Sequence, residues 1–259
     1  MSQFPAAESL RVAVAIPCYN ESAAVASVVS EYRAALPSAE IIIFDNNSTD
    51  GTGAVARGLG IRVIEVKKQG KGYALRAIFQ ELGDRDAVVV IDGDGTYPAD
   101  HVLKLLTPVL AGEADMSVGA RRPIDAPGAM TPVRGLGNLL IRAAFRILIG
   151  PGAGDMLSGY RVFGPRFLKG VSLHSRGFEI ETELTAEAVA RNFRVFEFPV
   201  PYRPRMEGTV SKLRVFRDGG RILIRILKES LRRKPLRLIL LTVAAFVIAL
   251  GLLHFSGIR

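Results

Sequence analysis

The feature that most constrains the fold is a regular alternation of short, β-branched runs with segments of helical periodicity across residues 11–199. Alternation of this kind predicts a mostly parallel sheet with helices on both faces, so we expect an α/β fold. The predicted strands are Arg11–Pro17, Ile41–Asp45, Arg62–Val66, Ala87–Asp92, Met116–Gly119 and Arg194–Pro199, and the predicted helices are Glu21–Leu36, Gly51–Gly58, Lys71–Leu82, Asp100–Leu110, Arg134–Leu148 and a segment near Glu179–Ala190.

A long apolar run near the C-terminus indicates a membrane segment. Residues 238–255 are interrupted only by Thr242 and His254, and with Leu236 the run has about the length that crosses a bilayer as a helix. A buried core helix is the alternative. Because basic residues crowd before the run and only Arg259 follows it, the positive-inside rule keeps residues 1–235 cytoplasmic. We expect a single-pass protein of the cytoplasmic (inner) membrane, with a spanning helix at 236–255 and with the C-terminus on the opposite side of the membrane.

The positive charge of the chain is concentrated just before that run. The net charge is +9, and the segment from Arg203 to Arg237 alone holds 12 basic against 3 acidic residues. A neutral remainder beside a basic, apolar segment favours an anionic membrane surface over nucleic acid as a partner. Within residues 213–234, leucines and basic residues recur on separate helical faces. This pattern predicts an interfacial helix, with an ordinary solvated surface helix as the alternative.

Several classes of protein are excluded by what the sequence lacks. Cys18 is the only cysteine, so neither an intrachain disulfide nor a cysteine-type zinc site can form. Residues 1–10 lack the apolar region of a signal peptide. The sequence has no P-loop motif and no dinucleotide fingerprint after the first strand, and its three histidines have neither metal nor triad spacing.

Polar clusters follow three of the predicted strands. Residues 17–21 follow the first strand, residues 45–51 the second and residues 92–96 the fourth. Each cluster alone could be a helix cap with its turn, since Asn, Asp, Ser and Gly are favoured there. In open parallel sheets, however, ligands bind beyond the carboxyl ends of the strands. Three such clusters at one sheet edge therefore predict a binding site.

Asp92 and Asp94 are the most specific indication of a site at that edge. Side chains two residues apart point the same way along a strand, and the small Gly93 between them leaves room for a phosphate. Two such carboxylates would suit a Mg²⁺ or Mn²⁺ ion that also binds a diphosphate. The alternative is a surface turn, because an isolated Asp-x-Asp is a weak signal.

These motifs resemble the family 2 glycosyltransferases of GT-A fold, and within them the polyprenyl-phosphate branch that includes dolichyl-phosphate mannose synthase. The matching segments occur in the family's order over residues 11–215. They are Ile16–Glu21 (the opening motif), Asp45–Thr52 (the nucleoside-binding loop), Asp92–Asp94 (the metal motif), Asp155–Arg161 and Gly177–Glu181 (the acceptor side) and Arg205–Leu213 (the closing loop).

The resemblance implies roles for individual residues. The metal would be held by Asp92 and Asp94, and the catalytic residues would be Asp94, Asp155 and Lys212, with Asp155 orienting a group rather than acting as an essential base. A Gln that is a metal ligand in some relatives is replaced by Thr96. The nucleotide-sugar would be bound by Pro17, Tyr19, Glu21, Asp45, Asn47, Asp92, Arg205 and Lys212, and the acceptor phosphate by Arg121, Arg134 and Asn138.

The expected activity is transfer of one sugar, with inversion, from a UDP- or GDP-sugar to a polyprenyl phosphate at the cytoplasmic membrane face. The chain has no tryptophan, so it lacks the Gln-x-x-Arg-Trp element of processive family members. Residues 1–212 would form the GT-A catalytic domain, followed by the interfacial helix and the span. Alternatives are a hydroxyl acceptor, which would require a base such as Asp155 or Glu179, and a non-catalytic membrane adaptor that binds a nucleotide-sugar. Self-association stays open.

Overall fold

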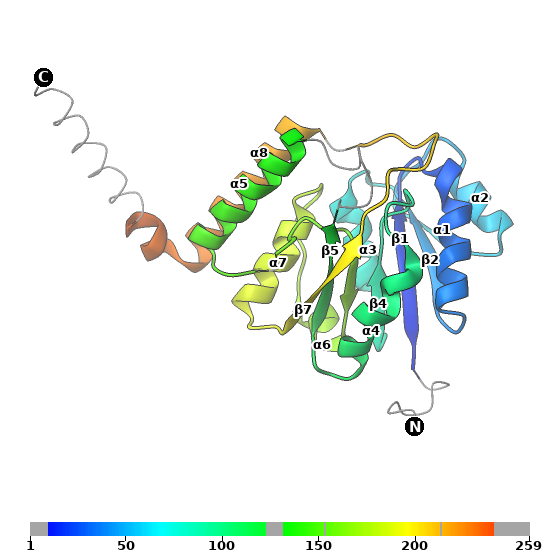
Figure 1. Ribbon diagram of the computed structural model, residues 1–259, viewed down its shortest axis with the longest axis horizontal. Helices are drawn as coiled ribbons and strands as arrows, with labels where there is room; N and C mark the ends of the chain where they lie inside the picture. Colours follow the sequence, from blue (N-terminus) through cyan, green and yellow to red (C-terminus); the bar gives the residue numbers. More distant parts are fainter. Residues whose placement is uncertain (1–9, 123–131, 153, 213, 241–259) are drawn as a thin grey trace, which may run out of the picture.

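The protein folds around one seven-stranded sheet, seen in the computed structural model in Figure 1. The structure describes residues 10–122, 132–152, 154–212 and 214–240. The strand order is β3-β2-β1-β4-β6-β5-β7. The strands are β1 (Val12–Cys18), β2 (Glu40–Asp45), β3 (Arg62–Glu65), β4 (Ala87–Val90), β5 (Met116–Arg122), β6 (Arg161–Phe163) and β7 (Val195–Pro201).

Six of the seven strands run parallel, and β6 is antiparallel to both of its neighbours, β4 and β5. The central strands are buried on both faces, as expected for a covered parallel sheet. Thus β1 is apolar and almost fully buried, and all four residues of β4 are buried. The prediction of a mostly parallel α/β sheet is confirmed.

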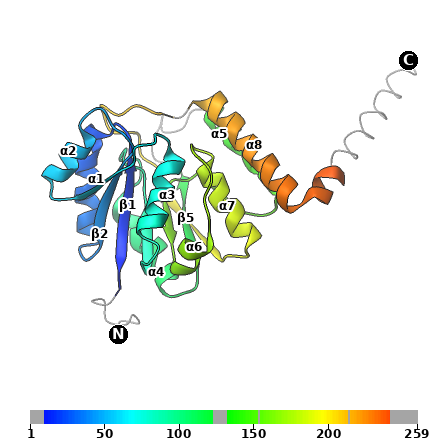
Figure 2. The same cartoon turned by 180° about the vertical axis from the view of Figure 1, so that it is seen from behind.

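Helices cover both faces of the sheet (Figure 1; Figure 2). On one face α1 (Ser22–Ala35) and α4 (Val102–Leu110) join one apolar core, with the short α2 (Thr52–Gly58) at its margin. On the other face α3 (Lys71–Glu81), α6 (Pro165–Gly170) and α7 (Ile180–Ala190) join a second core. Helical periodicity explains this placement, because α1 buries residues 25, 28, 29 and 32 on one side.

Two long helices form an arm beside the sheet. Helices α5 (Pro132–Leu148) and α8 (Val215–Arg233) pack together over a small apolar cluster that includes Phe145, Ile222 and Ile226. Two ion pairs, Arg225 with Glu183 and Arg233 with Glu187, fasten α8 to α7. Both arginines also pair with Glu229 on α8 itself. Most of these charges are buried, so the contact holds the arm in one position.

The predicted helices and strands agree with the structure to within a few residues, with two omissions. The three-residue strand β6 and the short helix α6 were not predicted. A 3-10 turn (Ala99–His101) precedes α4, where the sequence predicted one helix from Asp100. The fourth strand ends at Val90 instead of Asp92, which changes how the two acidic side chains beyond it are placed.

The predicted membrane location requires correction. Among the described residues, no helix has both the length and the apolar character needed to cross a bilayer. The predicted span at 236–255 continues from residue 241 outside the described part of the chain, and the five described residues at its start are far fewer than the ~20 that a span requires. The prediction of a single-pass chain with its C-terminus across the membrane is therefore not supported.

Candidate functional site: a strapped acidic edge and a basic pocket

The acidic edge lies where the strand order reverses. The chain winds from β1 outward to β2 and β3, then returns to β4 on the other side of β1. Crevices at such switch points are where open α/β sheets bind ligands. Glu21 follows β1, and Asp92 and Asp94 follow β4. A Cβ atom on Gly93 would lie 2.5 Å from Cys18 Sγ, so this glycine lets the two loops pack together.

The loop after β2 is tied to the loop after β1 by side-chain hydrogen bonds. Ser48 Oγ accepts from Asn20 N at 3.0 Å, and Thr52 Oγ1 accepts from Glu21 N at 2.9 Å. Asp45 Oδ1 accepts from Ser48 N at 3.0 Å, which turns this loop back beside β1. The structure thus brings Glu21, Asp45 and their neighbours Pro17, Tyr19 and Asn47 to one edge.

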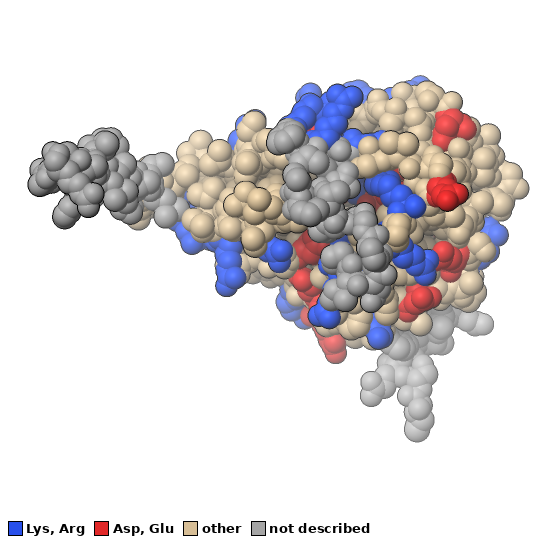
Figure 3. Space-filling view, turned by 45° about the horizontal axis from the view of Figure 1, so that its top comes forward, with Lys and Arg blue, Asp and Glu red and all other residues tan. Residues whose placement is uncertain are grey.

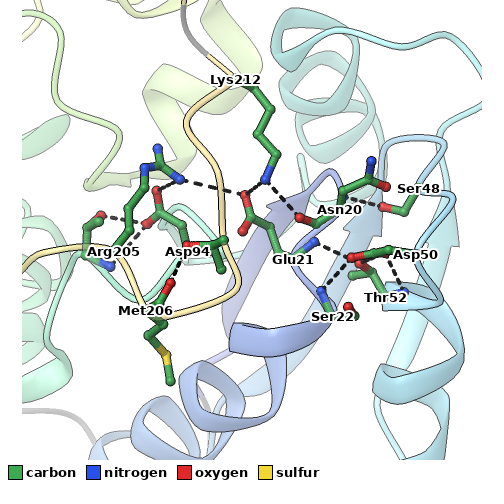
Figure 4. Close-up of polar contacts among 12 residues, drawn as sticks. Asn20, Glu21, Ser22, Ser48, Asp50, Thr52, Asp94, Arg205, Met206 and Lys212 are labelled. Carbon is green, nitrogen blue, oxygen red and sulfur yellow. Dashed lines mark hydrogen bonds and ion pairs between the residues drawn. The ribbon is translucent and has the colours of Figure 1, made fainter.

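A strap of residues 202–212, which connects β7 toward α8, crosses above this edge (Figure 1; Figure 4). Its backbone is joined to the loop after β4, because Arg203 N donates to Thr96 O at 2.9 Å. Gly95 has a φ of +76°, and a Cβ there would lie 2.8 Å from Met206 Cγ. The strap is therefore packed closely over the residues that follow Asp94.

The side chains of two cations on the strap, Arg205 and Lys212, reach the acidic edge (Figure 4). Arg205 Nη1 lies 2.6 Å from Asp94 Oδ2 and 3.9 Å from Glu21 Oε1. Lys212 Nζ lies 2.6 Å from Glu21 Oε1 and donates to Asn20 O at 2.8 Å. Burial raises the pKa of Glu21 to about 7, although Lys212 lowers it in part. The strap thus supplies positive charge directly over the acidic side chains.

Asp92 and Asp94 have separate partners. Asp94 is buried, and its Oδ1 accepts from Thr96 Oγ1 at 2.7 Å while its Oδ2 faces Arg205. Asp92 Oδ1 instead lies 2.5 Å from Lys71 Nζ. Among the described residues, no three His, Cys, Asp or Glu side chains group closely enough to form a metal site of their own. Any cation here would need oxygen ligands from a bound molecule as well.

A second, basic pocket lies next to this edge. Its volume is about 470 Å³. It opens between the end of β5, helix α5 and the segment 154–157, and its polar lining comprises Arg121, Arg122, Asn138, Arg142, Asp155 and Glu197. The segment that follows connects the two sites, because a Cβ on Gly159 would lie 2.4 Å from Asp92 Oδ2.

Arg121 and Asp155 form a bidentate ion pair inside this pocket. Arg121 Nε and Nη2 donate to the two carboxylate oxygens at 2.7 and 2.8 Å. Burial alone would raise the pKa of Asp155, but the Arg121 guanidinium outweighs it and holds that pKa below its usual value. Asp155 is therefore ionised and fully engaged, which makes it a poor proton acceptor.

The family of the chain follows from its similarity to known proteins. The model of the glycosyl transferase family 2 matches residues 13–156, more than half of the chain. The chain is a family 2 glycosyltransferase. It is 36% identical over 225 residues to the glycosyltransferase AglJ of Haloferax volcanii, covering 87% of this chain and 74% of that one. It is also 32% identical over 219 residues to the polyprenol monophosphomannose synthase of Mycolicibacterium smegmatis, covering 78% of this chain and 81% of that one.

The fold of this glycosyltransferase resembles a solved structure of the same architecture. Glucosyl-3-phosphoglycerate synthase from Mycobacterium tuberculosis, in complex with Mn²⁺ and UDP-glucose, aligns with a TM-score of 0.63 over 87% of this chain and 79% of that one, at 22% identity. The similarity shows a GT-A-like fold, as the sequence predicted.

The predicted site residues of the glycosyltransferase fall into two groups. The residues expected to bind the donor and metal lie around the strapped edge, and Arg121, Asn138 and Asp155 meet in the basic pocket. Arg134 lies on α5, but its side chain is outside the described part of the structure.

Sequence reasoning missed two cations that the structure places at these sites. Lys71 reaches Asp92, and Arg142 lines the basic pocket. Arg142 follows Asn138 by four residues, one turn along the same helix face, so this spacing could have identified it. Lys71 had no comparable signal, because its partners come from distant parts of the sequence.

Proposed function

We propose that this family 2 glycosyltransferase transfers one sugar, with inversion, from a nucleotide-sugar to a polyprenyl phosphate in a reaction that depends on a divalent cation. The observation that carries the proposal is the basic pocket beside the acidic edge, in which Asp155 is already neutralised by Arg121. A hydroxyl acceptor needs a base to remove its proton. A phosphate monoester is largely dianionic near neutral pH and is already a nucleophile.

The acidic edge suits a divalent cation and a diphosphate. Carboxylate oxygens are the ligands that Mg²⁺ and Mn²⁺ prefer, and a cationic group, Arg205, already lies between Asp94 and Glu21. We propose that Asp94 holds the metal, with Asp92 beside it at the donor, and that Pro17, Tyr19, Glu21, Asp45 and Asn47 contact the nucleoside. Mn²⁺ bound with UDP-glucose in the mycobacterial structure of similar fold is consistent with this assignment.

The acceptor phosphate would lie in the basic pocket. Arg121 is committed to Asp155, whereas no described carboxylate lies within ion-pair distance of Arg122 or Arg142. Arginine forks match phosphate geometry, so we propose that these two side chains bind the phosphate together with Asn138 and the predicted Arg134. Arg121 would then act on the phosphate through its positive charge, and its ion pair with Asp155 would hold its side chain in place.

The arm offers a surface for the lipid part of such an acceptor. Leu136, Leu139, Leu140 and Ile147 on α5, and Leu223, Ile224, Leu227 and Leu231 on α8, are 42–60% exposed. In Figure 3 the arm that projects to the left is tan over most of the face in view and blue along its lower edge. We propose that α8 lies in a lipid interface, as its sequence pattern predicts. Arg225 is paired with α7 instead, so the basic contacts would fall to Lys228 and Arg232.

The proposed reaction is an in-line displacement. An oxygen of the acceptor phosphate attacks the anomeric carbon, the bond from that carbon to the nucleoside diphosphate oxygen breaks, and the electron pair leaves with the diphosphate. Arg205 and Lys212 would move from Asp94 and Glu21 onto the departing diphosphate and stabilise its charge. A bound divalent cation would neutralise further charge on the same diphosphate.

The experiment that tests this function uses the purified chain with a panel of UDP- and GDP-sugars, a polyprenyl phosphate in detergent micelles, and Mn²⁺, Mg²⁺ or EDTA. Mass spectrometry of the lipid extract should show a polyprenyl-phosphate monosaccharide with one donor, and none in EDTA. A product that forms equally well in EDTA would contradict the metal role. Donor binding without any transferred sugar would support the adaptor alternative.

A further inference from the structure

The segment Gly70-Lys71-Gly72 opens helix α3 against the backbone of the loop before α7. Gly72 N donates to Arg176 O at 3.1 Å. A Cβ on Gly70 would lie 2.2 Å from Arg176 O, and one on Gly72 would lie 2.3 Å from Ser175 O. Gly70 also has a φ of +140°, which other residues rarely adopt. Both glycines are therefore needed for α3 to begin in contact with this loop.

That contact places Lys71 between two carboxylates. Lys71 Nζ lies 2.5 Å from Asp92 Oδ1 and 2.6 Å from Glu181 Oε1. The side chains of Lys71 and Glu181 are 13% and 5% exposed. A charge this buried is stable only with a partner, and here each of the three charged groups has one. The triad joins the start of α3, the loop after β4 and the first turn of α7.

Gly159 closes the other side of Asp92. A Cβ there would lie only 2.4 Å from Asp92 Oδ2 and 2.7 Å from its Cγ. Asp92 is thus held between Lys71 and the backbone of Gly159. If Lys71 were absent, Asp92 and Glu181 would face each other without a cation, and repulsion would turn Asp92 toward solvent.

We infer that Lys71 is a positioning residue for sugar transfer, which holds Asp92 toward the donor, and that Glu181 acts on the reaction only through Lys71. This inference rests on the proposed contact of Asp92 with the donor. It accounts for the glycines on both sides of Lys71, and it gives the buried Glu181 a role in donor binding although no atom of it would touch the donor.

The test compares Lys71→Met, Lys71→Arg, Glu181→Gln and the double variant Lys71→Met/Glu181→Gln. The matched control is Glu187→Gln, because Glu187 is also buried on α7 but pairs with Arg191 and Arg233. Three quantities are measured: kcat/KM for the donor at saturating acceptor, the Kd of UDP or GDP, whichever matches the donor, by calorimetry without acceptor, and the KM for the acceptor. The second readout stands even if the acceptor is not a polyprenyl phosphate.

Lys71→Met should lower donor kcat/KM on the order of 10²-fold and weaken nucleoside diphosphate binding, because small displacements of a positioned group cost about this much. The KM for the acceptor should not change, and Lys71→Arg should recover much of the loss. In the double variant, Glu181→Gln should add nothing to the effect of Lys71→Met.

A folded Lys71→Met variant with wild-type donor kinetics would overturn the inference, as would additive effects in the double variant or a change confined to acceptor KM. If Lys71→Met does not fold, Glu181→Gln decides alone, because it keeps a hydrogen-bond acceptor at Lys71. It should weaken donor binding severalfold relative to Glu187→Gln, and equal binding by the two variants would contradict the inference.

Discussion

Arg121 and Asp155 are joined by three hydrogen bonds, two from the guanidinium and one from the backbone amide of Arg121 to Asp155 Oδ2 at 3.0 Å. The Arg121 guanidinium also lies over the ring of Tyr202, the first residue of the strap, at 5.5 Å from its centroid. One ion pair thus links the basic pocket to the strap that crosses the acidic edge.

Replacing Asp155 by Asn should separate a structural role from a catalytic one. Both side chains of the pair are less than a fifth exposed, so the change should lower the free energy of unfolding by about 3 kcal/mol. Because Asp155 is not expected to act as a base, the shape of the pH–rate profile should stay that of wild type. Urea unfolding and kcat/KM across pH measure the two effects. Loss of the limb that rises with pH would instead assign the base role to Asp155.

Glu21 should make stability depend on pH in an identifiable window. Its pKa rises from 4.5 to about 7 in the folded protein, mainly through burial. Below pH 4.5 both states are protonated and the contribution is fully present. Between pH 4.5 and 7 the unfolded state loses its proton first, so this contribution falls by about 3 kcal/mol as pH rises. Wild type should therefore lose stability relative to Glu21→Gln as the pH rises through this window, whereas a difference in unfolding free energy that does not change with pH would refute the shifted pKa.

Arg142 should bind the acceptor without affecting the donor. Arg142→Gln removes a cation from the basic pocket, so the KM for polyprenyl phosphate should rise roughly tenfold or more, the usual cost of losing a charge-assisted hydrogen bond. Donor KM should stay constant. Arg146→Gln, one turn further along α5 and outside the pocket lining, is the control. Equal acceptor KM values for the two variants would remove Arg142 from the site.

Arg205 should compete with the metal for Asp94. Its guanidinium contacts Asp94 Oδ2, so Arg205→Gln should tighten Mn²⁺ binding measured by calorimetry without donor. The same variant should slow transfer on the order of 10²-fold, because a group proposed to stabilise the leaving diphosphate is lost. Arg203→Gln is the matched control, since Arg203 lies on the same strap but pairs with Glu31 at 3.1 Å. Unchanged or weaker Mn²⁺ binding in Arg205→Gln would contradict the competition.

Much of the fold could be predicted from local pattern. The buried strands β1, β2 and β4 are apolar runs that end in polar turns, and α1 repeats its apolar residues at helical spacing, so both were located to within two residues. Strand β6 was not predicted, because a strand of three residues is too short to show periodicity. Its antiparallel pairing with β4 and β5 also depends on long-range contacts.

In the site, too, local motifs could be recognised from the sequence, but contacts between distant residues could not. The structure brings Glu21, Asp94, Arg205 and Lys212 into contact, yet sequence could not show that Arg205 would pair with Asp94. The basic residues predicted to share one exposed face of α8 are also not all at the surface. Arg225 is turned inward by Glu183, a residue 42 positions earlier, and no periodicity reveals such a partner.

The proposed lipid phosphate acceptor can be tested in a single competition experiment. The purified glycosyltransferase is given its donor and Mn²⁺ with equal amounts of a polyprenyl phosphate and the same polyprenol without phosphate, and the products are quantified by mass spectrometry. If the acceptor is a lipid phosphate, the sugar should appear on the phosphate lipid alone. Glycosylation of the free polyprenol at a comparable rate would contradict it.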